Sequence, residues 1–336
     1  MSGRLGDSLR RHNWLGLPVA VVIASFLPLF ATNPYDIHVM NSVLVFSILA
    51  LGLQFITGIA GQFSVGHVAF YGIAAYTSGW LTSEHGWPVI GGMVAGVIMA
   101  SFFGALMAPI TRLRGNYMAM ATLAFLGIVH LFLRNEQDLT GGTSGMGGIP
   151  APSLFGTELA DDGNFFVLCL IVLAVVLAML WRLSGDSRFG RALAMMRQDA
   201  DAAASVGVNT TELKIKAFIV SAAVAGIAGV LFAHQTNYVH PNDFTLTLAI
   251  LVLTMIVVGG LGSLTGAIVG AALLTLATEY LRFLDDWRLI LYGALVIAIM
   301  IYMPEGLVGG ARRLWDGVRR LWGGAVSRWR ARHATG

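Results

Sequence analysis

The stretch FFVLCLIVLAVVLAMLWRL, residues 165–183, decides what kind of fold this chain can adopt. Its only charged side chain is Arg182, next to the last residue of the run. A helix needs about 20 mostly apolar residues to cross about 30 Å of hydrocarbon. An apolar run of this length is therefore a candidate membrane-spanning helix, and the rest of the chain repeats the pattern.

The composition is that of a membrane protein. Hydrophobic residues make up 56% of the 336 residues and charged residues only 12%, against about 25% in a typical soluble domain. We predict an all-α polytopic membrane protein with about ten transmembrane segments, in a range of eight to ten. The segments are 14–32, 38–60, 63–82, 88–111, 117–134, 165–183, 215–236, 244–260, 264–281 and 287–304.

Two glycine-rich junctions make the count uncertain. The second and third segments meet at Gly58–Gly61, and the eighth and ninth meet at Gly259–Gly262. Each junction is either a tight turn between two spans or a broken, re-entrant helix, since non-helical backbone is tolerated in a membrane where protein surrounds it.

The basic residues predict the orientation. With the N-terminus in the cytoplasm, 18 of the 21 Lys and Arg residues fall on the inner side, and only Arg134, Arg282 and Arg288 fall outside. This bias matches the positive-inside rule. The apolar run from 14 to 31 could be a secretory signal, but we expect a retained first helix because the run is long and no cleavage site follows.

This topology divides the chain into regions. Residues 1–13 form a cytoplasmic tail and 14–304 a transmembrane domain with an outer loop at 135–164 and an inner loop at 184–214. The tail 305–336 is basic and cytoplasmic. Its residues Trp315, Trp322 and Trp329 are seven apart, so an amphipathic helix on the anionic leaflet is expected, and a disordered tail is the alternative.

The inner loop reads GRALAMMRQDADAAASVGVN over 190–209. Good helix formers fill 191–205, Gly207 stands where a glycine would end that helix, and Asn209 can cap the next one. Leu193, Met196 and Ala200 share one apolar face. Such a helix could dock in a groove of a soluble partner, or it could be a connector resting on the membrane surface.

Four stretches in order resemble one family. They are GQFSVGHVAF at 61–70, LRGNYMAMATL at 113–123, the inner loop with KAFIVSAAVAGIAGVL at 216–231, and VGGLGSLTG at 258–266. Together they resemble the LivM family, permease subunits of ABC importers for branched-chain amino acids. The resemblance covers residues from about 40 to 310 and implies a bacterial inner-membrane location.

The resemblance also implies partners. They are a LivH-like permease that completes the pore, two ATP-binding subunits like LivG and LivF, a periplasmic substrate-binding protein and membrane lipid, with no nucleic acid. The inner loop would contain the coupling helix that sits on an ATPase. The candidate coupling residues are Gly190, Arg191, Ala192, Arg197, Asp201 and Gly207.

The chain itself is expected to be no enzyme. Its only lysines, Lys214 and Lys216, do not follow a glycine-rich loop, so a phosphate-binding motif is absent from the sequence. We expect ATP to be hydrolysed by partner subunits, with no catalytic residue, cofactor or metal on this chain. An importer for urea or short amides is the alternative. An ion-coupled transporter would need buried carboxylates, for which Glu279 is the one candidate.

Candidate pathway residues cluster at the glycine-rich junctions. Unwound backbone can bind the charged ends of an amino acid, and close helix packing is the competing explanation for the glycines. The candidates are Gly61, Ser64, Gly66, His67, Phe70, Thr122, Gly259, Gly260 and Gly262. We expect Gly226, Gly229, Gly266 and Gly270 to serve packing.

The sequence departs from the family pattern in two places. The fifth segment has Gly127 and His130 where a glutamate and a basic residue are common, which bears on the substrate. We expect His130 to be interfacial. The inner loop has Arg197-Gln198-Asp199-Ala200 where arginine–glutamate–asparagine–glutamate is common, which suggests a partner-specific ATPase contact.

Overall fold

The computed structural model describes residues 33–113, 115–154, 157–158, 162–185 and 187–280, and beyond these 293–294, 296–298, 301, 303 and 306–310. The predicted first segment, most of the tenth and the three tail tryptophans lie outside the described residues. Each of the eight predicted segments between 38 and 281 contains a helix. The helical fold class is therefore confirmed for the part of the chain described.

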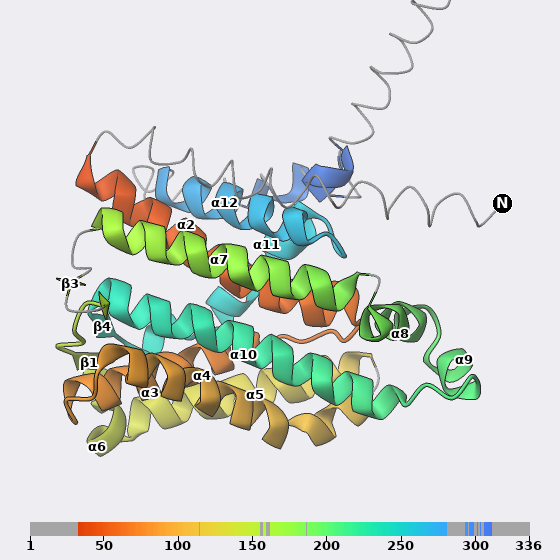
Figure 1. The fold of residues 1–336 in the computed structure, drawn as a ribbon, viewed down its shortest axis with the longest axis horizontal. Coiled ribbons are helices and arrows are strands. Elements are labelled where there is room, and N and C mark those ends of the chain that lie inside the picture. The colour runs from red at the N-terminus through yellow and green to blue at the C-terminus, as the bar shows by residue number, and fades with distance from the viewer. Residues whose placement is uncertain are drawn as a thin grey trace, which may run out of the picture.

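The elements follow the chain in a simple order (Figure 1). The long helices are α2 (Pro34–Leu53), α3 (His67–Ser83), α4 (Val89–Leu106), α5 (Asn116–Asn135), α7 (Asp162–Ser184), α10 (Thr210–Thr236), α11 (Leu246–Gly259) and α12 (Leu264–Tyr280). The π-helix η2 (Gln54–Ile59) extends α2. The short elements are η3 (Ala108–Arg112), α6 (Gln137–Thr140), η4 (Gly142–Ser144), β1 (Met146–Gly147), β2 (Ser153–Leu154), β3 (Thr157–Glu158), α8 (Arg188–Gln198), α9 (Ala200–Ser205), β4 (Tyr238–Val239) and η5 (Pro241–Asp243).

Six of the described helices are long and apolar enough to cross a membrane. They are Tyr35–Ile59, Val89–Leu106, Asn116–Asn135, Asp162–Ser184, Thr210–Thr236 and Pro241–Gly259. The other two predicted segments hold α3 and α12, which have 17 residues each. At 1.5 Å per residue such a helix is about 25 Å long, somewhat short of a full span. The chain is a multi-pass membrane protein.

Helix α10 is the centre of the bundle and packs against α2, α3 and α4. Small residues make this possible. A methyl group added at Gly229 would lie 2.1 Å from the Tyr71 carbonyl oxygen, and one at Gly226 would lie 2.8 Å from the Ala100 methyl group. The packing role predicted for these two glycines is confirmed, and it follows the rule that small residues let membrane helices approach closely.

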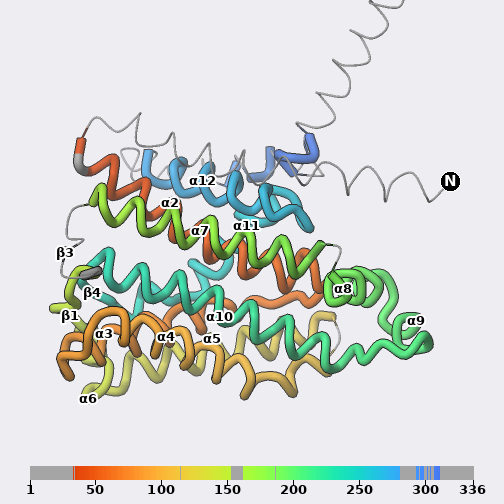
Figure 2. Tube along the Cα trace, in the orientation of Figure 1, coloured from red at the N-terminus to blue at the C-terminus, as the bar shows by residue number. Residues whose placement is uncertain are grey.

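The connections gather at two ends of the bundle (Figures 1 and 2). At one end, which we call the α8 end, helices α8 and α9 project beyond the long helices. At the other, the β1 end, β1 pairs antiparallel with β4, with Met146 opposite Val239. The predicted outer loop 135–164 is thus partly ordered by a strand that lies far away in the sequence.

The predicted helix over 191–205 is two helices, and this part of the prediction is wrong. Asp199 has an extended backbone, with φ −155° and ψ 110°, and its carboxylate accepts hydrogen bonds from the backbone N–H groups of Asp201 and Ala202. An aspartate that caps a new helix competes with continuation of the old one. The predicted ends are confirmed: Gly207 has φ +85°, and Asn209 accepts from the Glu212 N–H.

Candidate functional site

The junction between α2 and α3 is an extended segment that returns into the bundle. Helix α2 passes through η2, and residues 60–66 are then non-helical, with Gly61 at φ +72°. A methyl group at Gly52 would lie 2.7 Å from His67 Nε2. Gly52 precedes the end of η2 by seven residues, about 10 Å of helix. Of the two arrangements predicted here, the structure has the broken, re-entrant one. We call 60–66 the re-entrant segment.

His67 is buried where α2, α3 and α10 meet. Its Nδ1 lies 3.2 Å from Ser221 Oγ, and the same hydroxyl donates to the Gly52 carbonyl at 3.0 Å. Because the hydroxyl has only one hydrogen and gives it to Gly52, His67 must donate from Nδ1. Its Nε2 is buried and makes no side-chain hydrogen bond of ordinary geometry. The part predicted for His67 in a translocation pathway stays a prediction.

Helix α5 holds the re-entrant segment from the other side. The Val65 N–H donates to Thr122 Oγ1 at 3.1 Å. A methyl group at Gly66 would lie only 2.2 Å from the Thr122 carbonyl oxygen. Gly66 therefore has a packing reason, and Thr122 positions the segment through its side chain. Ser64 is buried within the same segment.

Phe70 lies one turn into α3 and is 2% exposed. Its ring packs on Phe125 at 5.3 Å and edge-on to Phe218 at 5.6 Å between ring centres. Such aromatic pairs stabilise by about 0.5–1.5 kcal/mol beyond the area they bury. Phe70 joins α3 to α5 and α10, and any part it plays in a pathway remains a prediction.

The junction between α11 and α12 is a tight turn. Gly260 and Gly262 have φ of +112° and +91°, and the Ser263 N–H donates to the Gly260 carbonyl. A methyl group at Gly259 would lie 1.9 Å from the Gly266 carbonyl oxygen, and one at Gly270 lies 2.0 Å from that of Met255. Close helix packing accounts for Gly259, and the packing role predicted for Gly266 and Gly270 is confirmed.

The two junctions meet each other and α8. A methyl group at Gly58 would lie 2.8 Å from the Gly262 backbone nitrogen, and one at Gly61 would lie 3.0 Å from Arg197 Cγ. At Gly262 the nearest atom would be Arg197 Nη1, at 2.9 Å. The structure thus brings together Gly61 and Gly262, which were predicted as pathway residues, and Arg197, which was predicted as a coupling residue.

The other predicted coupling residues divide by exposure. Gly190 is buried, its N–H donates to Ser187 Oγ at 2.9 Å, and a methyl group there would lie 2.7 Å from the Leu183 carbonyl oxygen. Gly190 therefore seats α8 against the end of α7. Ala192 is half-buried, whereas Arg191 and Asp201 are exposed, as a contact with another protein would require.

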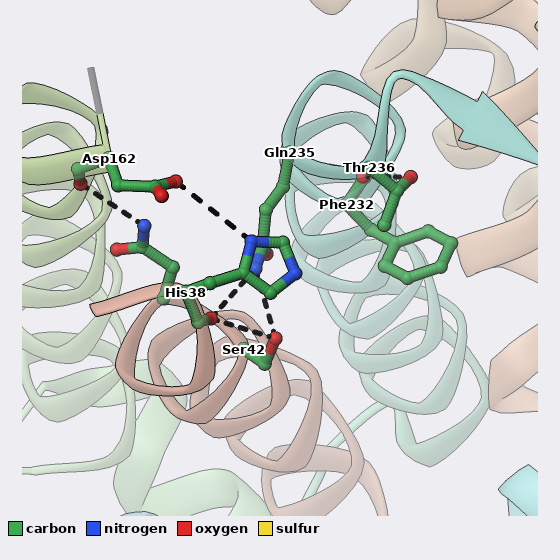
Figure 3. A network of polar contacts seen from close by, with 7 residues as sticks. His38, Ser42, Asp162, Phe232, Gln235 and Thr236 are labelled. Carbon is green, nitrogen blue, oxygen red and sulfur yellow. Dashed lines mark hydrogen bonds and ion pairs between the residues drawn. The ribbon is translucent and has the colours of Figure 1, made fainter. Parts of the chain in front are cut away.

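A polar cluster ties α2, α7 and α10 together at the β1 end (Figure 3). Gln235 Nε2 donates to the His38 carbonyl at 3.1 Å and to Ser42 Oγ at 2.9 Å. His38 Nδ1 lies 3.9 Å from an Asp162 carboxylate oxygen, and Asn41 donates to the Asp162 backbone carbonyl. The cluster orients three helix ends relative to one another.

Sequence reasoning missed these residues and also Gln54, Gln62 and Ser221. Apart from His38 and Asp162, all are neutral polar side chains in or beside apolar runs. A search restricted to ionisable groups passes over these neutral side chains, but a buried amide must find partners just as a charge must. Amides within predicted spans were the signal that could have found them.

Two candidates from the fifth and ninth segments have definite places. His130 is half-buried and its Nδ1 lies 3.1 Å from the Pro241 carbonyl oxygen, while Gly127 faces open space. Glu279 is half-buried and hydrogen-bonded to the Tyr35 hydroxyl. Among the described residues, no group of three or more His, Cys, Asp or Glu side chains could hold a metal.

Apolar helices around a non-helical segment, with a helical loop at one end, define a multi-pass membrane protein. The family model of the permease component of branched-chain amino acid transport systems matches residues 37–300, and the chain belongs to this family. The permease protein LivM of Salmonella typhimurium is 34% identical over 88% of this chain and 74% of its own length. LivM of Escherichia coli is 33% identical over 86% of this chain and 74% of its own length. LivH of Escherichia coli is 27% identical over 79% of this chain and 91% of its own length.

Proposed function

We propose that this chain is the transmembrane permease subunit of an ATP-driven importer of branched-chain amino acids, and that it forms the translocation pathway with a second permease subunit. The observation that carries the proposal is the 34% identity to a high-affinity LivM permease across nearly the whole chain. The similarity to LivH as well supports a pore built from two related subunits.

We propose a bacterial inner-membrane location with about ten transmembrane segments and both termini in the cytoplasm. The support is the 18-to-3 distribution of basic residues, which favours a cytoplasmic α8 end. The β1 end, with its paired strands and polar cluster, then faces the periplasm. A substrate-binding protein would deliver the amino acid there.

Helices α8 and α9 are the proposed docking site for one of two ATP-binding subunits. Leu193 and Met196 face inward and are buried, so α8 is anchored to the membrane domain. Met195 is exposed and could enter a partner's groove, and Arg191 is exposed on the same helix. ATP would be bound and hydrolysed by the partner subunits, and this chain would bind no cofactor of its own.

The substrate would pass close to the re-entrant segment. The non-helical backbone of this segment and the buried His67 Nε2, which has no side-chain hydrogen bond, could offer hydrogen bonds to an amino acid's charged groups. The binding protein would supply most of the selectivity, so urea or a short amide is the alternative cargo of the same architecture. The cognate binding protein's affinities for leucine, isoleucine, valine and urea decide between these cargoes.

The experiment that tests the function is uptake of labelled leucine into liposomes. The vesicles contain this chain with its second permease and the ATPases, and the binding protein is supplied outside. We expect uptake to require both internal ATP and the binding protein. Uptake driven by an ion gradient without ATP would contradict the proposal and favour a secondary transporter.

A further inference from the structure

The Arg197 side chain lies against both glycine-rich junctions, at the Gly61 bend of the re-entrant segment and at Gly262 between α11 and α12, which we call the two glycine turns. Arg197 follows the buried Leu193 by four residues on α8, so its base is on the inward side of that helix. Its Cγ and Nη1 are the nearest atoms to the Cβ positions of Gly61 and Gly262, at 3.0 Å and 2.9 Å. The aliphatic stem therefore contacts the re-entrant segment, and the guanidinium contacts the turn between α11 and α12.

Glycine at both turns avoids a close contact with the Arg197 side chain, which is exposed on its other side. Gly61 has φ +72° and Gly262 has φ +91°, a region where residues with a side chain are strained. A Cβ at either position would also press on Arg197. Gly61 and Gly262 thus allow the backbone to turn and also allow the Arg197 side chain to pack against it.

The two turns form one unit beneath Arg197. The Gly58 Cβ position lies 2.8 Å from the Gly262 nitrogen, so the backbones nearly touch. Gln54 Nε2 donates to the carbonyl of Gly260 at 2.9 Å and to that of Ser263 at 3.1 Å. A force on Arg197 therefore reaches the end of α2 and the turn between α11 and α12 together.

The far end of the coupling loop holds the same segment. Gln62 Nε2 donates to the Lys214 carbonyl, at the start of α10, at 3.2 Å. The re-entrant segment is thus contacted by α8, in the first half of the coupling loop, and by the start of α10, which follows the loop. At its other end the segment is bonded to Thr122 on α5. The re-entrant segment is a short, extended connection between the coupling loop and the buried His67, so it can lengthen very little.

We propose that Arg197 is a positioning residue that joins α8 to both glycine turns, so that movement of α8 shifts the two turns as a unit. This rests on the proposed function and adds to it the route by which movement of the coupling loop reaches the membrane domain. Arg197 then acts within this chain, whereas Arg191 remains a candidate for the ATPase surface.

The test compares Arg197→Met with Arg188→Met in the complete transporter in liposomes. Methionine keeps an apolar stem against Gly61 but removes the guanidinium from Gly262. Arg188 is exposed and nine residues earlier on α8, half a turn round the helix, so its replacement removes the same charge from the opposite face. Leucine uptake and ATP hydrolysis are measured on the same vesicles, and co-purification of the ATPases is measured separately.

We expect Arg197→Met to assemble normally and to lose about five-fold or more in leucine taken up per ATP hydrolysed, the scale of coupling between two sites. Arg197→Lys keeps a positive charge without the planar fork and should recover part of the ratio. Arg188→Met should leave the ratio unchanged, because any loss of docking lowers hydrolysis and uptake together.

Two results would overturn the inference. One is an unchanged ratio in Arg197→Met; the other is a loss of ATPase co-purification, which would make Arg197 a docking contact. In both cases the wild-type complex still imports leucine with ATP, so the proposed function stands. Failure of the wild-type complex to import leucine would instead reject the proposed function, and the inference with it.

Discussion

Replacing Gly66 by alanine tests the close approach of the re-entrant segment to α5. Gly66 has φ −84°, which alanine accepts, so any cost is steric and not due to backbone strain. The new methyl group would lie 2.2 Å from the Thr122 carbonyl oxygen, where ordinary contact begins at 3.4 Å. The segment or α5 must therefore move by roughly 1 Å, and overpacking of this kind costs about 1–3 kcal/mol.

Gly127→Ala is the matched control, on α5, the helix that Gly66 approaches. Nothing lies within 4 Å of the Cβ position there, and Gly127 is inside α5. Alanine in a helix interior is favoured over glycine by about 0.5–1 kcal/mol. The same chemical change should therefore be destabilising at Gly66 and neutral or stabilising at Gly127.

The chain carries its own reporter of unfolding. Cys169 is the single cysteine and is fully buried in α7, so a thiol-reactive dye should label it only when the bundle opens. On heating the purified subunit in detergent, we expect the labelling midpoint of Gly66→Ala to fall by about 2–6 °C. Because such unfolding is commonly irreversible, all variants are compared at one heating rate. Equal midpoints for Gly66→Ala and Gly127→Ala would refute the contact with Thr122.

Three further outcomes are expected from the same purified subunit. Ser221→Ala leaves the His67 Nδ1 donor without its partner and should destabilise by about 1–3 kcal/mol, seen as a lower labelling midpoint; a midpoint equal to wild type would argue against the bond. Gln54→Leu removes both bonds to the turn between α11 and α12, and hydrogen exchange there should rise, whereas unchanged exchange would count against the link. Asp199→Ala removes the cap of α9 at a cost of about 1 kcal/mol and should raise exchange over 200–205 alone; protection equal to wild type would contradict the cap.

Local features of the sequence predicted local features of the fold. The apolar runs predicted all eight helical segments between 38 and 281, because hydropathy is a property of consecutive residues. Gly207 and Asn209 predicted where the coupling loop ends and α10 begins, because a cap acts within one turn. The single helix predicted over 191–205 was wrong, because helix propensity does not register that the Asp199 carboxylate offers its own hydrogen bonds to the backbone.

Features that depend on distant residues were not predicted. The glycine-rich junctions looked alike in sequence, yet one is a re-entrant segment and the other a tight turn. The difference arises because Thr122 on α5 and Gly52 on α2 enclose the first, whereas Gly259 and Gly266 bring their own helices together at the second. The roles of Gln54 and Gln62 likewise depend on carbonyl groups far away in the chain.

By itself the sequence determined that this chain lies in a membrane, which way its basic residues bias the orientation, and where the coupling loop ends and α10 begins. These follow from transfer energies and hydrogen bonds that act over a few neighbouring residues. Only the tertiary structure decided that Arg197, Gly61 and Gly262 share one place. Contacts between residues so far apart depend on how the helices pack, and no periodicity or propensity encodes that packing locally.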